Sequence, residues 1–308
     1  MQQPIWLKLA LSLAGFLSVA NAQPADRIYP VVELTDRDVA EIDVTDGSVE
    51  DWEYIAGEPT LTPLDFAQTF GDSYDPSDMD FRIWLGWHDA TDRIFFAMER
   101  VDDVYVNEFD REDENEVMVF HDSSVEFAVD GDHSGGAVFP EERSENSWQD
   151  AWQAQVFDAL GEVFDGGSQI DLVPHSYHLS PAWFSQPPFA HGGGAVVGGS
   201  PIFSVTEFNV TPFDRFEPTT DPEDSDVSDL FGGKVIGFNI RIPDVDDQPG
   251  VETIHQLAVP PSYESFSDLL RMSADYFADG VLVTPDGLSS DNSAVESNSW
   301  ARIKAAIE

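Results

Sequence analysis

The chain has 308 residues and carries 59 acidic against 14 basic side chains, which gives a formal net charge of -45 at pH 7. Nucleic acid and anionic membrane surfaces are also negative, so this charge argues against both as partners. The sequence contains no cysteine, so no disulfide can brace the fold and a hydrophobic core must stabilise it alone. An acidic surface that is poor in lysine suits salty water and favours calcium binding.

Residues 1–22 have the features of a secretory leader peptide. One lysine precedes an apolar run that is too short to span a bilayer, and Ala-Asn-Ala at the end fits the small-residue cleavage rule. We therefore expect a secreted, periplasmic or cell-envelope protein whose mature chain starts at Gln23 and has no membrane span; an uncleaved anchor is the alternative. The remaining residues, 23–308, can form a single domain of about 285 residues.

Residues 81–103 are predicted to form a β-hairpin, with strand segments at 81–87 and 94–101. Apolar side chains alternate along the first segment, which is the period-two pattern of a strand with one face in a core, and Trp84 is left on the other face. The return segment is apolar on both faces, as expected for an inner strand of a two-layer sandwich. A third strand, rich in acids, ends at Asp132. The prediction is an all-β protein, an antiparallel β-sandwich with short helices.

The later part of the chain alternates between loops and strands. Residues 134–200 contain aromatic clusters and a glycine-rich run, and we expect a long, loop-rich excursion from the sandwich with strands inside it. Strands are predicted again at 202–210 and 234–243. A short helix is expected around 263–271, and a last strand or turn of helix at 299–306.

Four motifs occur in a meaningful order: RIWLGWHDATDRIFFAMERVDD, DSSVEFAVDGDHSGG, KVIGFNIRIPDV and SWARIKA. Together they resemble the family 9 carbohydrate-binding modules and their DOMON-like relatives, over most of the mature chain. The resemblance implies an antiparallel β-sandwich, sugar binding by aromatic side chains and bound calcium, and it does not imply catalysis. The chain departs from the family in the excursion and in Ile242-Pro243-Asp244, where the family has Ile-Pro-Trp.

The loop that begins at Asp130 has the spacing of a calcium loop. It offers oxygen ligands at alternate positions, a glycine at the sharp turn and a later carboxylate. The candidate metal ligands are Asp130, Asp132, Ser134 and Glu141. A strand enters this loop instead of a helix, and a solvated acidic turn is the alternative. Looser calcium candidates of the same kind are Asp102, Asp103, Asp246 and Asp247.

Sugars stack their C–H faces on aromatic rings, so the eight tryptophans are candidate ligand-binding residues. The candidates for binding a polysaccharide or oligosaccharide are Trp84, Trp148, Trp152 and Trp183. For each of them, a place in the core or over the end of the sandwich is the alternative. Trp87 and Trp300 are expected in the core.

Other chemistries have weaker signals. His175 and His178 have zinc-like spacing but no third ligand. DOMON-like relatives hold haem through a methionine and a histidine, so a haem-binding electron-transfer module stays open as an alternative, with Met98 or Met118 and a histidine such as His191. No nucleophile elbow or phosphate loop is present, and paired carboxylates are too common here to identify a glycosidase. We expect a secreted, non-catalytic carbohydrate-binding protein stabilised by calcium; a calcium-stiffened envelope protein is a further alternative.

Overall fold

The described part of the chain is built almost entirely from β-strands. The computed structural model describes residues 28–71, 73–106, 124–136, 138, 154–164, 167–174, 181–197, 201–217, 221–246, 253–258 and 273–285. The helices within these ranges are two six-residue elements, α1 (Asp36–Glu41) and α2 (Glu50–Ile55), and short 3-10 turns. The all-β prediction is therefore confirmed. None of the helices in these ranges has the length and apolar character needed to cross a membrane.

The strands are numbered in chain order. They are β1 (Ile28–Glu33), β2 (Ala67–Phe70), β3 (Met79–His88), β4 (Arg93–Asp102), β5 (Ser124–Asp130), β6 (Gln155–Phe164), β7 (Gly167–Pro174), β8 (Ala190–Val197), β9 (Ile202–Val210), β10 (Phe213–Arg215), β11 (Asp226–Val227), β12 (Val235–Asp244), β13 (Thr253–Gln256) and β14 (Ala278–Val283). The 3-10 turns are η1 (Pro63–Asp65), η2 (Asp89–Thr91), η4 (Ala182–Ser185), η5 (Pro222–Asp224) and η6 (Ala274–Tyr276).

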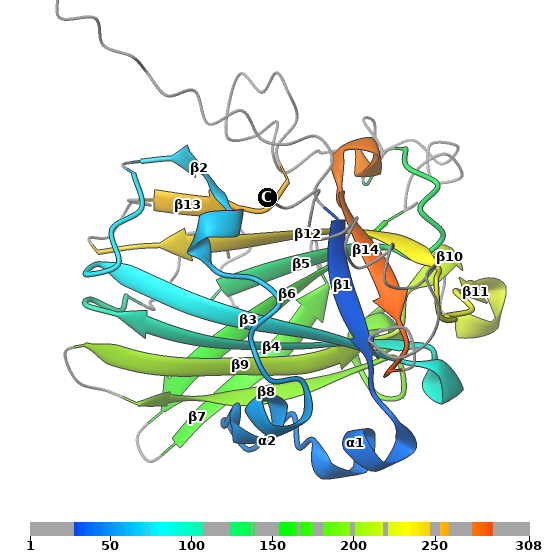
Figure 1. Ribbon diagram of the computed structural model, residues 1–308, viewed down its shortest axis with the longest axis horizontal. Helices are drawn as coiled ribbons and strands as arrows, with labels where there is room; N and C mark the ends of the chain where they lie inside the picture. Colours follow the sequence, from blue (N-terminus) through cyan, green and yellow to red (C-terminus); the bar gives the residue numbers. More distant parts are fainter. Residues whose placement is uncertain are drawn as a thin grey trace, which may run out of the picture.

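One long sheet folds over itself to make both layers of the sandwich. Its strand order is β7-β6-β5-β12-β14-β1-β3-β4-β9-β8, with β13 added beside β12 and β2 beside β13. In Figure 1, β5, β6 and β7 pass behind the layer formed by β3, β4, β9 and β8. The pairing is antiparallel except at β1, which runs parallel to both β14 and β3, so the sheet is mixed.

The main core lies between the two layers and is rich in phenylalanine. Phe96 of β4 stacks on Phe208 of β9, with ring centroids 4.5 Å apart. Phe127 of β5 approaches both rings at 5.7 Å from the opposite layer. The core-facing residues of β3 include the ones that alternate in the sequence, Phe81, Ile83, Leu85 and Trp87. Burial of this apolar surface is the main stabilising contribution in a chain without disulfides.

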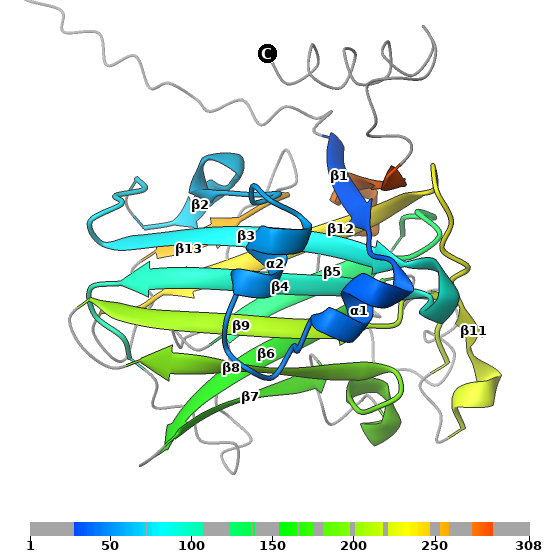
Figure 2. The same cartoon turned by 60° about the horizontal axis from the view of Figure 1, so that its bottom comes forward.

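A second apolar cluster covers the outer face of the β3–β4–β9 layer. Trp84 and Phe95 point away from the main core and pack against Trp52 of α2 and other side chains of residues 34–56, which we call the N-terminal strap. Figure 2 shows α1 and α2 lying over this face. The strap explains why both faces of the β3–β4 hairpin are apolar.

Most of the described part of residues 134–200 consists of three strands of the sheet, so the strands expected inside the excursion are present. β6 pairs with β5, β7 with β6, and β8 with β9. Residues 191–197 of the glycine-rich run belong to β8. A Cβ at Gly192 would lie 2.5 Å from the carbonyl oxygen of Glu207, and one at Gly193 would lie 2.8 Å from Thr45 Cα. These glycines therefore permit close approach of the neighbouring backbone and the strap.

Candidate metal centre

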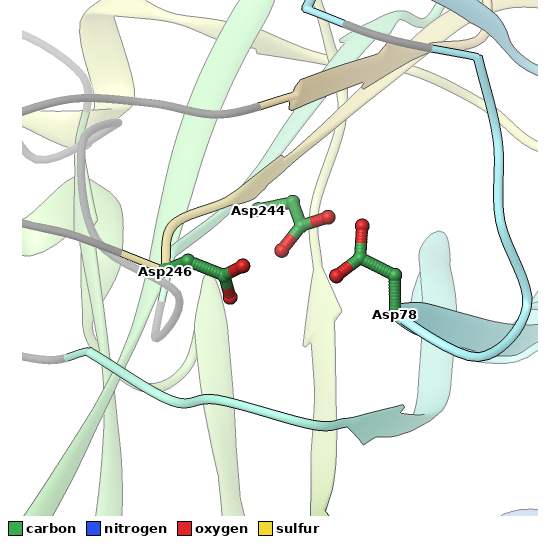
Figure 3. Close-up of side chains that lie close together, drawn as sticks. All are labelled: Asp78, Asp244 and Asp246. Carbon is green, nitrogen blue, oxygen red and sulfur yellow. The ribbon is translucent and has the colours of Figure 1, made fainter.

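Five aspartates gather at one end of the sandwich, where β4 and β12 end and β3 begins. They are Asp78, Asp102, Asp103, Asp244 and Asp246, and we call them the acidic cluster. They form two overlapping groups that share Asp246, and within each group one carboxylate oxygen per residue lies within 4.8 Å of the others. The first group, Asp78 with Asp244 and Asp246, is drawn in Figure 3, where the three carboxyl groups converge.

Strand pairing brings these residues together from distant parts of the sequence. In the β3–β4 hairpin Met79 is opposite Asp102, so Asp78 and Asp103 follow as the next neighbours. The Asp103 backbone N–H donates to the Asp78 carbonyl oxygen at 3.0 Å. Arg100 extends from β4 and donates through Nη1 to the Pro243 carbonyl at 3.4 Å, which links the hairpin to the end of β12.

Two members of the cluster are almost completely buried. Asp102 is 1% exposed and Asp244 is 2% exposed. Asp244 Oδ1 has no hydrogen-bond partner within the described ranges. Arg100 contributes one positive charge, with Nε 3.9 Å from Asp102 Oδ2, whereas the cluster contains five carboxyl groups. A buried carboxylate without compensation is costly, so this arrangement calls for a cation or for bound protons.

The pKa values express the same imbalance. Burial raises the pKa of Asp244 to about 8, and the charges of Asp102 and Asp78 add to this effect. Burial also raises the pKa of Asp102 to about 6, although Arg100 opposes the rise. Burial and the nearby Asp246 raise the pKa of Asp78. Without a cation, Asp244 therefore holds a proton at neutral pH.

The chemistry of the donors fits a hard divalent cation. All five side chains offer oxygen, and calcium takes several carboxylate oxygens in flexible geometry. Zinc sites in proteins are usually built with histidine or cysteine, which this group of five does not contain. The cluster can therefore hold calcium, with Asp246 available to either group of ligands.

The sequence anticipated three members of this cluster and missed two. Asp102, Asp103 and Asp246 were among the looser calcium candidates, and the structure brings them together. Asp247 lies outside the described residues. Asp78 and Asp244 were not expected. The signal that could have found Asp244 is its position, because it replaces the tryptophan that follows Ile-Pro in the family the chain resembles.

The loop after β5, which has the spacing of a calcium loop, uses its carboxylates in another way. Asp130 is buried and accepts backbone hydrogen bonds from Gly135 at 2.8 Å and from Ser134 at 3.3 Å. Asp132 Oδ1 accepts a second bond from Ser134 N–H at 3.1 Å. Burial raises the pKa of Asp130 to about 7, and its hydrogen bond with Asp132 contributes. Glu141 lies outside the described residues, so a metal ion at this loop stays a prediction.

The candidate sugar-stacking tryptophans have different environments. Trp84 is 0% exposed, and its indole N–H donates to the Gly57 carbonyl at 3.0 Å. In this structure the strap separates it from solvent, so a sugar ring cannot reach it. Trp183 is only partly buried and packs on an aromatic group, with its ring 4.9 Å from that of Phe189. Trp148 and Trp152 lie outside the described residues, as does Trp300, whereas Trp87 lies in the core as expected.

The described haem-ligand candidates do not face one another. Met98 is part of the main core, while His191 is exposed on the outer face of β8. Residues on opposite faces of a sheet cannot be the two axial ligands of one haem. Met118, His175 and His178 lie outside the described residues.

Comparison with known proteins gives structural similarity only. No family model matches the sequence, and neither does any curated protein. A family 9 carbohydrate-binding module from Caldicellulosiruptor kristjanssonii, solved with cellotriose, is 11% identical with a TM-score of 0.46, over 87% of this chain and 97% of the module. The family 9 module from the same organism solved with glucose has the same identity and TM-score, over 87% of this chain and 99% of the module. A putative carbohydrate-binding protein from Bacteroides uniformis is 12% identical with a TM-score of 0.38, over 83% of this chain and 99% of that protein. The first two belong to the family that the sequence motifs resemble.

Proposed function

We propose that this protein binds carbohydrate without transforming it, and that calcium at the acidic cluster stabilises its β-sandwich. The observation that carries the calcium assignment is Asp244, a buried carboxyl group with an unpartnered oxygen that faces Asp78 and Asp246. The resemblance of the four ordered motifs supports the carbohydrate assignment. The leader-like first 22 residues support export to a compartment where calcium is available to weak sites.

Calcium would replace a proton and relieve repulsion at the same time. Without the ion, the high pKa of Asp244 keeps that carboxyl group neutral at pH 7. A divalent cation makes the ionised form favourable, because it supplies the positive charge that Arg100 alone does not. Since β3, β4 and β12 all contribute, the ion would link strands that are distant in the sequence.

The calcium proposal can be tested by thermal unfolding of the mature chain in calcium chloride and in a chelator. Calcium that binds only the folded state should raise Tm, and the increase should grow with calcium concentration. Asp244→Asn should lose most of this response and yet unfold near the wild-type temperature in chelator, because Asn mimics the protonated carboxyl group. Asp89→Asn, at the opposite end of the same hairpin, is the control and should respond like wild type. Equal calcium responses in Asp244→Asn and wild type would exclude this site.

The carbohydrate proposal needs a separate test, because calcium binding alone does not imply it. Cellotriose, glucose and a panel of soluble glycans can be titrated into calcium-loaded protein and followed by calorimetry. Trp183→Ala tests the partly buried tryptophan within the described residues, and Tyr54→Ala, an exposed aromatic residue on the strap, is the control. If no glycan binds while calcium still raises Tm, the protein is a calcium-stabilised structural protein instead.

A further inference from the structure

A glutamate is completely buried between the sheet and the N-terminal strap. Glu207 belongs to β9, where its neighbour Phe208 points into the main core, so Glu207 points to the opposite, strap-covered face. Its exposed fraction is 0%. In the sheet it lies between Ala97 of β4 and Gly193 of β8, neither of which can form a side-chain hydrogen bond with it.

The strap contacts this glutamate directly. Trp52 of α2 donates its indole N–H to Glu207 Oε1 at 3.0 Å, which joins residues that are 155 positions apart. The other oxygen, Oε2, is buried and has no hydrogen-bond partner within the described ranges. An ionised carboxylate would leave that oxygen both charged and unsolvated, which is unfavourable.

The charges on the strap add to this cost. Burial raises the pKa of Glu207 to about 8, and Asp51 and Asp46 of the strap contribute further, against the hydrogen bond from Trp52. The other charged or titratable residues of the strap and of the strands beneath it include Asp36, Arg37, Asp38, Glu41, Asp43, Glu50, Glu53 and Tyr54 of the strap, Arg82 and His88 of β3, Arg93 and Glu99 of β4, and His191 of β8. The His88 ring also contacts the strap, with Nε2 3.1 Å from Asp36 Oδ1.

The cations on this face are engaged elsewhere. Arg82 binds Glu99 at 2.6 Å and Glu53 at 3.2 Å. Arg93 donates to Asn209 Oδ1 at 3.2 Å and to the Pro188 carbonyl. Neither arginine therefore has its charge directed to Glu207.

The strap fits too closely to admit solvent while it is in place. Gly47 lies so near β8 that a Cβ on it would be 2.4 Å from Ala195 Cβ, and Gly193 of β8 similarly approaches Thr45. Gly47 also has φ of 69°, a conformation that favours glycine. Hydration of an ionised Glu207 thus requires the strap to move.

We propose that Glu207 is a proton-operated latch, which holds the strap against the β3–β4–β9–β8 face while its carboxyl group is neutral and releases the strap when it ionises. The closed form binds one proton that the open form gives up at the ordinary pKa of glutamate. Strap closure therefore weakens as pH rises from that ordinary value to about 8, and it changes little above it. Opening would expose Trp52 and Trp84 to solvent.

The test is amide hydrogen exchange of the mature protein between pH 5.5 and 9.5, corrected for the intrinsic pH dependence of exchange. We expect opening at residues 42–55 to increase by at most about tenfold per pH unit up to about pH 8 and then to level off. Core amides of β3 serve as the internal reference, because global unfolding would affect them as well. A strap whose corrected protection does not change with pH would overturn the proposal.

Two variants and one control sharpen the test. Glu207→Gln keeps an acceptor for Trp52 but cannot ionise, so its strap protection should lose most of its dependence on pH. Trp52→Phe removes a hydrogen-bond donor that favours the ionised form of Glu207. The pH at which strap protection levels off should therefore move to a higher value. This variant remains informative if Glu207→Gln does not fold. Glu50→Gln, an exposed acid on the same strap, should behave like wild type. Wild-type pH dependence in Glu207→Gln would overturn the proposal.

Discussion

Asp103 donates its backbone N–H to the carbonyl oxygen of Asp78 at 3.0 Å, so the open end of the β3–β4 hairpin holds two acidic residues side by side. Asp244 and Asp246 reach the same place from the end of β12. Repulsion among such groups destabilises the sandwich end unless protons or a cation neutralise them. Protons and calcium therefore compete for the carboxylates of the acidic cluster.

Calcium affinity should therefore depend on pH. Asp244, with its pKa raised to about 8, and Asp102, with its pKa raised to about 6, must be ionised to coordinate the ion fully. We expect affinity to rise from pH 5.5 to pH 8, and calcium binding at pH 7 to release about one proton. Calorimetry in two buffers with different ionisation enthalpies measures this release. Identical apparent enthalpies in both buffers at pH 7 would contradict the prediction.

The metal-free protein should lose stability as pH rises. The pKa of Asp244 is higher in the folded state than in the unfolded state. Its stabilising contribution to the free energy of unfolding is therefore complete below about pH 4 and is lost as pH approaches 8. Asp102 acts in the same direction up to about pH 6. His255 acts oppositely, because burial lowers its pKa to about 4 and its contribution is lost as pH falls from 6.5. Each group changes the free energy of unfolding by at most about 1.4 kcal/mol per pH unit.

Urea unfolding in chelator at several pH values measures this dependence. The free energy of unfolding should decrease from pH 6.5 to pH 8, a range in which His255 no longer contributes. Saturating calcium should remove the part of this decrease that is due to the acidic cluster. Asp244→Asn should show a weaker decrease than wild type in chelator. An increase in stability over this range would show that the raised pKa values are not those of the folded protein.

Arg100 should matter most when calcium is absent. It is a buried cation beside Asp102, so Arg100→Met leaves the cluster without its internal positive charge. Removal of one partner of a buried ion pair costs about 3–5 kcal/mol. Calcium should recover part of this loss, so the rise in Tm on calcium addition should be larger than in wild type. Arg37→Met, an exposed arginine of α1, is the control. A smaller calcium response in Arg100→Met would mean that Arg100 helps to build the ion site.

Local patterns predicted the strands well, whereas the cluster and the strap depend on contacts between distant segments. Alternation along residues 81–87 correctly placed Trp84 on the face away from the main core. It gave no sign that residues 34–56 cover that face. The glycines of β8 suggested a loop, because glycine is unfavourable in strands, yet close packing requires them there. In a chain with 59 acids, the position of Asp244 after Ile242-Pro243 was its one distinguishing feature in the sequence, and its burial comes only from tertiary packing.

Trp84 should be a structural residue in the closed state of the strap. It is completely buried in the second apolar cluster, and its indole N–H is satisfied by Gly57. Trp84→Ala should lower the free energy of unfolding by about 3–5 kcal/mol, because it leaves a large cavity and an unpaired carbonyl group. Glycan affinity measured well below the lowered Tm should stay unchanged, in contrast to Trp183→Ala. Loss of glycan binding in folded Trp84→Ala, with wild-type stability, would instead place Trp84 in the sugar site and require the strap to open for binding.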